Sequence, residues 1–153
     1  MKIQYPSYPD LRDRTVLITG GGSGIGAAFV EAFVLQGSRV AFLDIQNEVS
    51  QELIQSLSGK GPEPIYVDCD VTDISALKDA IQQVEEELGA VRVLINNAAS
   101  DERHNPEEVT PEYWENRLKV NLNHHFLRHR QFNPRWQRLE GVRSSIWVPS
   151  VGI

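Results

Sequence analysis

Five of the seven residues from Gly20 to Gly26 are glycines. This run stands between an apolar segment, Thr15–Thr19, and a stretch of helical periodicity that starts at Ile25. Glycine permits a tight turn and a close approach of backbone amides to a bound group, and the N-terminus of a following helix favours an anion. A strand, a glycine turn and a helix in this order are typical of a site for the pyrophosphate of a dinucleotide.

An acidic residue stands where such a site would need one. Asp44 ends the next β-like run, Arg39–Leu43, 18 residues after Gly26. A carboxylate at this place can accept hydrogen bonds from both hydroxyls of an adenosine ribose, and it would repel a 2′-phosphate. The pattern therefore favours NAD over NADP. The alternative is a plain glycine turn followed by a solvated aspartate.

Strands and helices that would position these residues alternate along the chain. Short apolar runs predict strands at Thr15–Thr19, Arg39–Leu43, Ile65–Val67 and Val91–Ile95. Apolar residues at helical spacing predict helices from Ile25 to Gly37, around Leu53 and Leu57, from Ile74 to Gly89, and from Thr110 through Phe126. This alternation predicts an α/β fold, a Rossmann-like doubly wound parallel sheet with flanking helices, truncated before its later strands.

Two further motifs follow predicted strands. Asp70-Val71 comes after the third strand, and Asn96-Asn97-Ala98-Ala99 ends the fourth. With the spacing of the glycines, these motifs make residues 15–126 resemble the short-chain dehydrogenase/reductase family, although Ala99 stands where that family usually has glycine. The resemblance implies cofactor contacts from Gly20, Ser23, Gly24, Ile25, Gly26, Asp44, Asp70, Val71 and Asn97. Asp70 would bind the adenine amine, the Val71 backbone would meet the ring, and the asparagine motif would line the ribose and nicotinamide.

The resemblance also implies a catalytic residue, Asn121, within Val120-Asn121-Leu122. It falls where the family carries a helix-borne asparagine that holds a water in the proton relay. The alternative is a buried asparagine that caps an irregularity in the helix.

A narrower resemblance concerns the substrate. The stretch Asn97–His104, followed by Tyr113-Trp114, is similar to the NAD-dependent aldose 1-dehydrogenases that act on galactose, xylose or arabinose. The resemblance implies that Asp101, Arg103 and His104 lie beside the cofactor on the loop after the fourth strand, where such sheets bind ligands. The alternative is an ordinary polar loop.

The family's proton-transfer residues are not among these 153 residues. Hydride transfer in the family needs a Tyr-x-x-x-Lys pair and a serine, and no tyrosine of this sequence has that spacing. Ser150 lies near the expected serine position, but Pro149 is poorly suited to a central strand. We therefore expect an NAD-dependent oxidoreductase that is inactive alone, with a non-catalytic dinucleotide-binding module or a truncated remnant as the alternative.

Charge divides the chain near Phe126. Ten basic and twenty acidic residues precede this point, whereas five basic residues and one acidic residue follow it. If the coding triplets were read one base earlier, the triplet that spans Trp136 and Gln137 would encode alanine, as in the family. The triplet that spans Trp147 and Val148 would encode glycine, again as in the family. We therefore expect residues 1–126 to form the dinucleotide-binding portion. Residues 127–153 would be a divergent basic tail that is translated out of frame, and not an arm that binds nucleic acid.

Composition limits the other possibilities. One cysteine, Cys69, excludes a disulfide scaffold and a multi-cysteine zinc site. No apolar run approaches the roughly 20 residues needed to span a bilayer, and Pro6 and Pro9 stand where a signal peptide would be apolar. We expect a cytoplasmic protein that acts on a small molecule such as an aldose, with no metal, nucleic acid or membrane partner. His124, His125 and His129 are expected at the surface, and the homo-oligomer of the parent family is doubtful for this chain.

Overall fold

A five-stranded parallel sheet forms the centre of the computed structural model, which describes residues 6–100, 102, 104–123 and 143–146. Its strands are β1 (Thr15–Thr19), β2 (Arg39–Asp44), β3 (Ile65–Asp68), β4 (Val93–Asn96) and β5 (Arg143–Ile146), in the spatial order β3-β2-β1-β4-β5. Every pair of neighbours is parallel. The predicted fold class is therefore confirmed. Strands β2 and β3 follow β1 on one side of it, whereas β4 and β5 lie on its other side, so the strand order reverses between β1 and β4.

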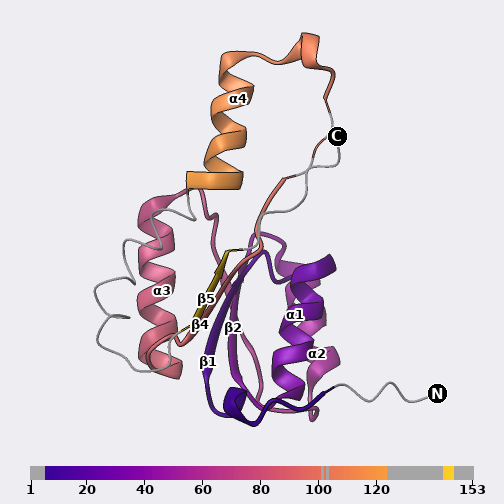
Figure 1. Cartoon of the computed structure of the whole chain (residues 1–153), viewed down its shortest axis with the longest axis vertical. Coiled ribbons are helices and arrows are strands. Elements are labelled where there is room, and N and C mark those ends of the chain that lie inside the picture. Colours follow the sequence, from indigo (N-terminus) through magenta and orange to yellow (C-terminus); the bar gives the residue numbers. More distant parts are fainter. Residues whose placement is uncertain (1–5, 101, 103, 124–142, 147–153) are drawn as a thin grey trace, which may run out of the picture.

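Helices cover both faces of the sheet (Figure 1). One face carries α1 (Gly24–Leu35) and α2 (Asn47–Leu57), and the other carries α3 (Ile74–Leu88). A fourth helix, α4 (Pro111–Leu118), continues into a π-helical segment, η3 (Lys119–Asn123).

The alternation of side chains along β1 divides the core into two clusters. Val16 and Ile18 pack with α1 and α2, whereas Leu17 packs with α3, and all three side chains are fully buried. A strand covered on both faces needs apolar residues at successive positions, which is why its sequence lacks polar alternation.

Two predicted boundaries differ from the structure. Regular pairing of β4 begins at Val93 rather than Val91, and the backbone N–H of the preceding Arg92 donates to the O of Thr15, the first residue of β1, at 2.9 Å. The helix predicted through Phe126 stays α-helical only to Leu118. Its apolar side chains at Trp114 and Leu122 are 59% and 55% exposed, since no described element packs over them.

Strand β5 belongs to the segment for which the sequence predicts a divergent tail. It pairs with β4 in register, Asn96 opposite Ile146. Residues 124–142 and 147–153 lie outside the described residues, and with them the predicted boundary at Phe126, the three histidines and Ser150. The change of reading frame stays a prediction. In the part of the chain that is described, no helix is long and apolar enough to cross a membrane.

The two-sided core makes a stability prediction. Replacing Leu17 by Ala should lower the free energy of unfolding by about 2–5 kcal/mol, because the side chain is fully buried and its removal leaves a cavity. Leu35→Ala is the matched control: its side chain is 45% exposed, and the expected loss is below about 0.5 kcal/mol. Urea denaturation followed by circular dichroism measures both, and equal losses would contradict the two-cluster core.

Candidate dinucleotide site

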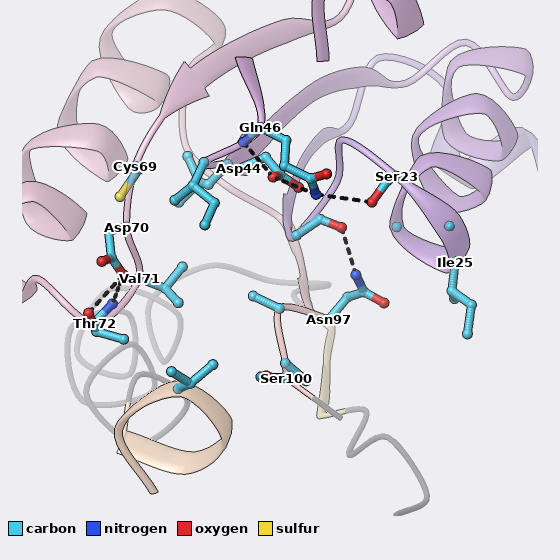
Figure 2. Close-up of a pocket in the computed structure, with 18 of the residues that line it drawn as sticks. Ser23, Ile25, Asp44, Gln46, Cys69, Asp70, Val71, Thr72, Asn97 and Ser100 are labelled. Atoms are coloured by element: carbon cyan, nitrogen blue, oxygen red, sulfur yellow. Dashed lines mark hydrogen bonds between the residues drawn. The ribbon is translucent and has the colours of Figure 1, made fainter. Parts of the chain in front are cut away.

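A cavity of about 730 Å³ opens at the carboxyl ends of β1, β2, β3 and β4 (Figure 2). All nine residues that the sequence predicts as cofactor contacts line it: Gly20, Ser23, Gly24, Ile25, Gly26, Asp44, Asp70, Val71 and Asn97. The cavity lies where the strand order reverses, which is the place where open parallel sheets bind ligands.

The glycine turn is packed too tightly for side chains. Gly20 has a φ of +63°, and a Cβ there would lie 2.8 Å from Ala98 Cα. A Cβ on Gly26 would overlap the carbonyl oxygen of Gly20. The backbone N–H of Gly20 donates to Leu43 O at 2.7 Å, which holds the turn against β2. Only glycine allows the first turn of α1 to sit this close to the end of β1.

Helix α1 begins at this turn without a cap from its own side chains. Ser23 is the N-cap residue, but its hydroxyl makes no capping hydrogen bond, and the first turn has no acidic residue. The first amides of a helix have no partner within the helix and carry a partial positive charge. Because Ser23 to Gly26 line the cavity, this end of α1 fits a bound phosphate group.

Asp44 is held against the glycine turn from the end of β2. Its side chain is only 7% exposed, and its Oδ2 accepts a hydrogen bond from the Gly22 N–H at 2.8 Å. Its Oδ1 accepts from the Gln46 N–H at 3.0 Å. These bonds fix the carboxylate in the cavity wall before any ligand is present.

Gln46 is a site residue that sequence reasoning missed. Its Nε2 donates to Ser23 Oγ at 3.2 Å and approaches Asp44 Oδ1 at 3.5 Å (Figure 2). The side chain therefore joins the loop after β2 to the glycine turn. Its position two residues beyond the strand-ending aspartate was the available signal.

Tyr66 supports the same strand end from β3. Its hydroxyl donates to the Asp44 carbonyl oxygen at 3.2 Å. Burial raises the pKa of Tyr66 above its ordinary value of 10.0, and the nearby carboxylates of Asp68 and Asp44 raise this pKa further. The phenol therefore stays a protonated donor throughout the neutral range.

Asp70 and Val71 form the cavity wall at the end of β3. Asp70 Oδ1 accepts from both the N–H and the hydroxyl of Thr72, each at 2.8 Å. Its other carboxylate oxygen has no hydrogen-bond partner among the described residues, and Val71 beside it is 8% exposed. This arrangement offers an oriented acceptor next to an apolar surface.

Asn97 is hydrogen-bonded to the glycine turn and to the end of β1. Its Nδ2 donates to Gly20 O at 2.8 Å, and its backbone N–H donates to Thr19 Oγ1 at 3.1 Å. The loop after β4 is thereby tied to the end of β1, and the carboxamide supports the turn as well as lining the cavity.

Asn121 lies in the π-helical segment η3, and its side chain is directed at the loop after β4. Its Oδ1 accepts from the Ser100 N–H at 2.8 Å, and its Nδ2 donates to Ser100 O at 3.1 Å. Ser100 and Val120 line the cavity, whereas Asn121 itself does not. π-Helical turns occur frequently at functional sites, and the water-holding role of Asn121 stays a prediction.

The three loop residues expected beside the cofactor have different outcomes. Asp101 and Arg103 lie outside the described residues. His104 is exposed and is not part of the cavity wall, and its Nδ1 lies 2.8 Å from the hydroxyl of Tyr113. Ser100 and Asn116 line the cavity instead, and the sequence had not assigned either of them a role.

Comparison with known proteins agrees with this geometry. The family described as short chain dehydrogenase matches residues 14–146. The chain belongs to this family. The match includes the glycine turn, the asparagine motif and β5.

Among its relatives, the probable galactose dehydrogenase GalD of Rhizobium meliloti is 46% identical over 142 residues, which are 92% of this chain and 56% of that protein. The D-xylose 1-dehydrogenase of Caulobacter vibrioides is 46% identical over 117 residues, 76% of this chain and 46% of that enzyme. Among solved structures, the aldohexose dehydrogenase AldT of Thermoplasma acidophilum superimposes with a TM-score of 0.76 at 28% identity, covering 92% of this chain and 51% of that one. The chain therefore spans about half the length of these relatives.

The crowded turn predicts that alanine destabilises the fold more at Gly26 than at Gly24. Gly26→Ala should lower the free energy of unfolding by about 3 kcal/mol, because the new Cβ meets a backbone oxygen that cannot move aside. Gly24→Ala is the control: the space around it is open, and its φ of +54° costs about 1 kcal/mol. Denaturant unfolding compares the two, and a smaller loss for Gly26→Ala would contradict the described packing.

Proposed function

We propose that this chain binds NAD and forms the cofactor-holding part of a dehydrogenase that oxidises the anomeric hydroxyl of an aldose to a lactone. The observation that carries the proposal is the buried carboxylate of Asp44, fixed beside an uncapped, glycine-lined helix N-terminus in one cavity. A hydroxyl-bearing ribose and an anionic pyrophosphate need these two neighbouring environments.

Charge supports NAD over NADP. The described cavity wall contains two carboxylates, Asp44 and Asp70, and neither lysine nor arginine. A 2′-phosphate on the ribose would meet the Asp44 carboxylate with no cation beside it, and like charges at such distances repel. The ribose hydroxyls of NAD would instead donate to that carboxylate.

Each part of the cofactor has residues suited to it. Asp70 and Val71 would hold the adenine, Asp44 the ribose, and the turn from Ser23 to Gly26 the pyrophosphate. The nicotinamide half would then lie toward the end of β4, over Asn97 and Ser100. When bound, the cofactor supplies a hydride acceptor.

The sugar substrate is proposed from relatives. Two proteins that are 46% identical are named as galactose and D-xylose dehydrogenases, and a solved aldohexose dehydrogenase shares the fold. The proton that leaves the sugar hydroxyl needs a base such as the family's tyrosine, and no Tyr-x-x-x-Lys occurs within the 153 residues. We therefore propose cofactor binding, and not turnover, for these 153 residues. A cytoplasmic location belongs to the same proposal.

Calorimetric titration tests the cofactor. The chain should bind NAD more tightly than NADP, and Asp44→Ala should weaken NAD binding about 10- to 100-fold, because charge-assisted hydrogen bonds to the ribose are lost. Asp79→Ala, which removes an exposed carboxylate from α3, is the matched control and should leave the affinity unchanged. Unchanged NAD affinity in Asp44→Ala would refute the proposed ribose site.

A second candidate is a dinucleotide-binding module without catalysis, and the missing Tyr-x-x-x-Lys favours it for these 153 residues. We expect the chain to bind NAD and to produce no NADH from galactose or xylose, because no described group is placed to accept the proton. Absorbance at the NADH band measures this after the binding titration. Rates near those of a complete sugar dehydrogenase would contradict the expectation.

A further inference from the structure

An arginine on α4 fastens the loop that follows β4. The guanidinium of Arg117 donates from Nη1 to the Ser100 hydroxyl and from Nη2 to the Glu102 carboxylate. It also lies over the ring of Tyr113, 4.7 Å from the ring centre. The Arg117 side chain is 14% exposed, whereas that of Glu102 is 69% exposed. The cation is therefore largely shielded from solvent, whereas its carboxylate partner is exposed.

A second contact joins the same loop to the same helix. The Tyr113 hydroxyl lies 2.8 Å from His104 Nδ1 and donates to Glu102 O at 3.4 Å. The two rings meet edge to face, with centres 4.8 Å apart. We use the name loop clamp for Ser100, Glu102, His104, Tyr113 and Arg117. Its members come from two segments that meet only in the folded chain.

Ser100 is the point where the loop clamp reaches the cavity. Its backbone N–H and C=O both bond to the side chain of Asn121, and its hydroxyl bonds to Arg117. All three polar groups of a cavity-lining residue are thus fixed by α4 and η3. A displaced Arg117 would release the hydroxyl and the Glu102 side chain together.

The position of Ser100 relative to the glycine turn indicates which part of a ligand it meets. Asp44 lies on the β2 side of the turn, and Ser100 lies on the β4 side. A dinucleotide with its pyrophosphate on the turn and one ribose at Asp44 must place its other half over the end of β4. Ser100, the residue through which the loop clamp reaches the cavity, therefore borders the nicotinamide half.

We propose that Arg117 is a positioning residue for the nicotinamide half of the cofactor, acting through Ser100 and Glu102. The proposal rests on the proposed NAD-binding function. Arg117 does not itself line the cavity, so its effect must pass through the loop. Lysine cannot replace it, because a single ammonium lacks the planar fork that reaches two acceptors at once.

The first experiment measures amide hydrogen exchange in the full chain without ligand. Arg117→Gln should speed exchange in the peptide that contains Ser100, whose N–H donates to Asn121, and should leave β1 unchanged. Lys60→Gln, which breaks the exposed ion pair with Glu31, is the control and should change neither peptide. Unchanged exchange at Ser100, or faster exchange throughout the chain, would overturn the positioning role.

The second experiment titrates NAD and ADP, which shares only the adenosine and diphosphate. Arg117→Gln should weaken NAD binding about tenfold and leave ADP binding unchanged, because only NAD extends to the loop clamp. Glu102→Gln should also weaken NAD binding. In the double variant the two losses should not add, because both changes break one interaction.

The outcomes separate the two proposals. Equal losses of NAD and ADP in Arg117→Gln would show a general structural role and overturn the inference. Unchanged NAD affinity in Arg117→Gln, beside a wild-type chain that binds both ligands, would overturn it as well. A wild-type chain that binds neither ligand would overturn the proposed NAD function and, with it, the cofactor part of this inference.

Discussion

The hydrogen bond from the Asn97 carboxamide to the Gly20 carbonyl oxygen, 2.8 Å long, joins three elements that must meet for the cavity to exist. Gly20 follows β1, Asn97 follows β4, and Gly26 brings the first turn of α1 so close to the same oxygen that a side chain would collide with it. Since β1 and β4 are neighbours, this contact fixes the floor of the cavity where the strand order reverses. The uncapped N-terminal end of α1 can then face the groups at the ends of the other strands.

The polar groups around this floor are largely bound before a ligand arrives. Asp44 is held by the amides of Gly22 and Gln46, and Asp70 by Thr72. A site whose groups are already oriented loses little conformational entropy on binding. Burial removes water from the Asp44 carboxylate, and the hydrogen bonds from the backbone N–H groups of Gly22 and Gln46 offset this loss of hydration. This arrangement keeps the cavity formed in the absence of a ligand.

The loop after β4 connects that site to α4. On one side Asn97 supports the glycine turn, and on the other Ser100 is bonded by Asn121 and Arg117. The loop is thus held from both ends by groups on different elements. Such an arrangement couples the packing of α4 to the shape of the cavity, although Asn116 is the one residue of α4 among the described residues of the wall.

The sequence by itself determined the features that depend on local spacing. The glycines predicted the turn, the two-sided apolar runs predicted buried parallel strands, and Asp44 was predicted as a site residue because it ends a strand. The identities of Asp70 and Asn97 followed from their motifs. The predictions of the turn and the strands are confirmed because backbone conformation and strand periodicity are properties of short segments. The cofactor-binding roles of Asp44, Asp70 and Asn97 stay predictions.

Only the tertiary structure decided which distant side chains pair. Gln46 with Ser23, Asn121 with Ser100, and Arg117 with Glu102 are 23, 21 and 15 residues apart, and no periodic pattern links their members. The π-helical segment and the start of β4 at Val93 were likewise not predicted from the sequence. The physical reason is that a hydrogen bond between loops depends on the relative placement of whole strands and helices, which packing of the core fixes.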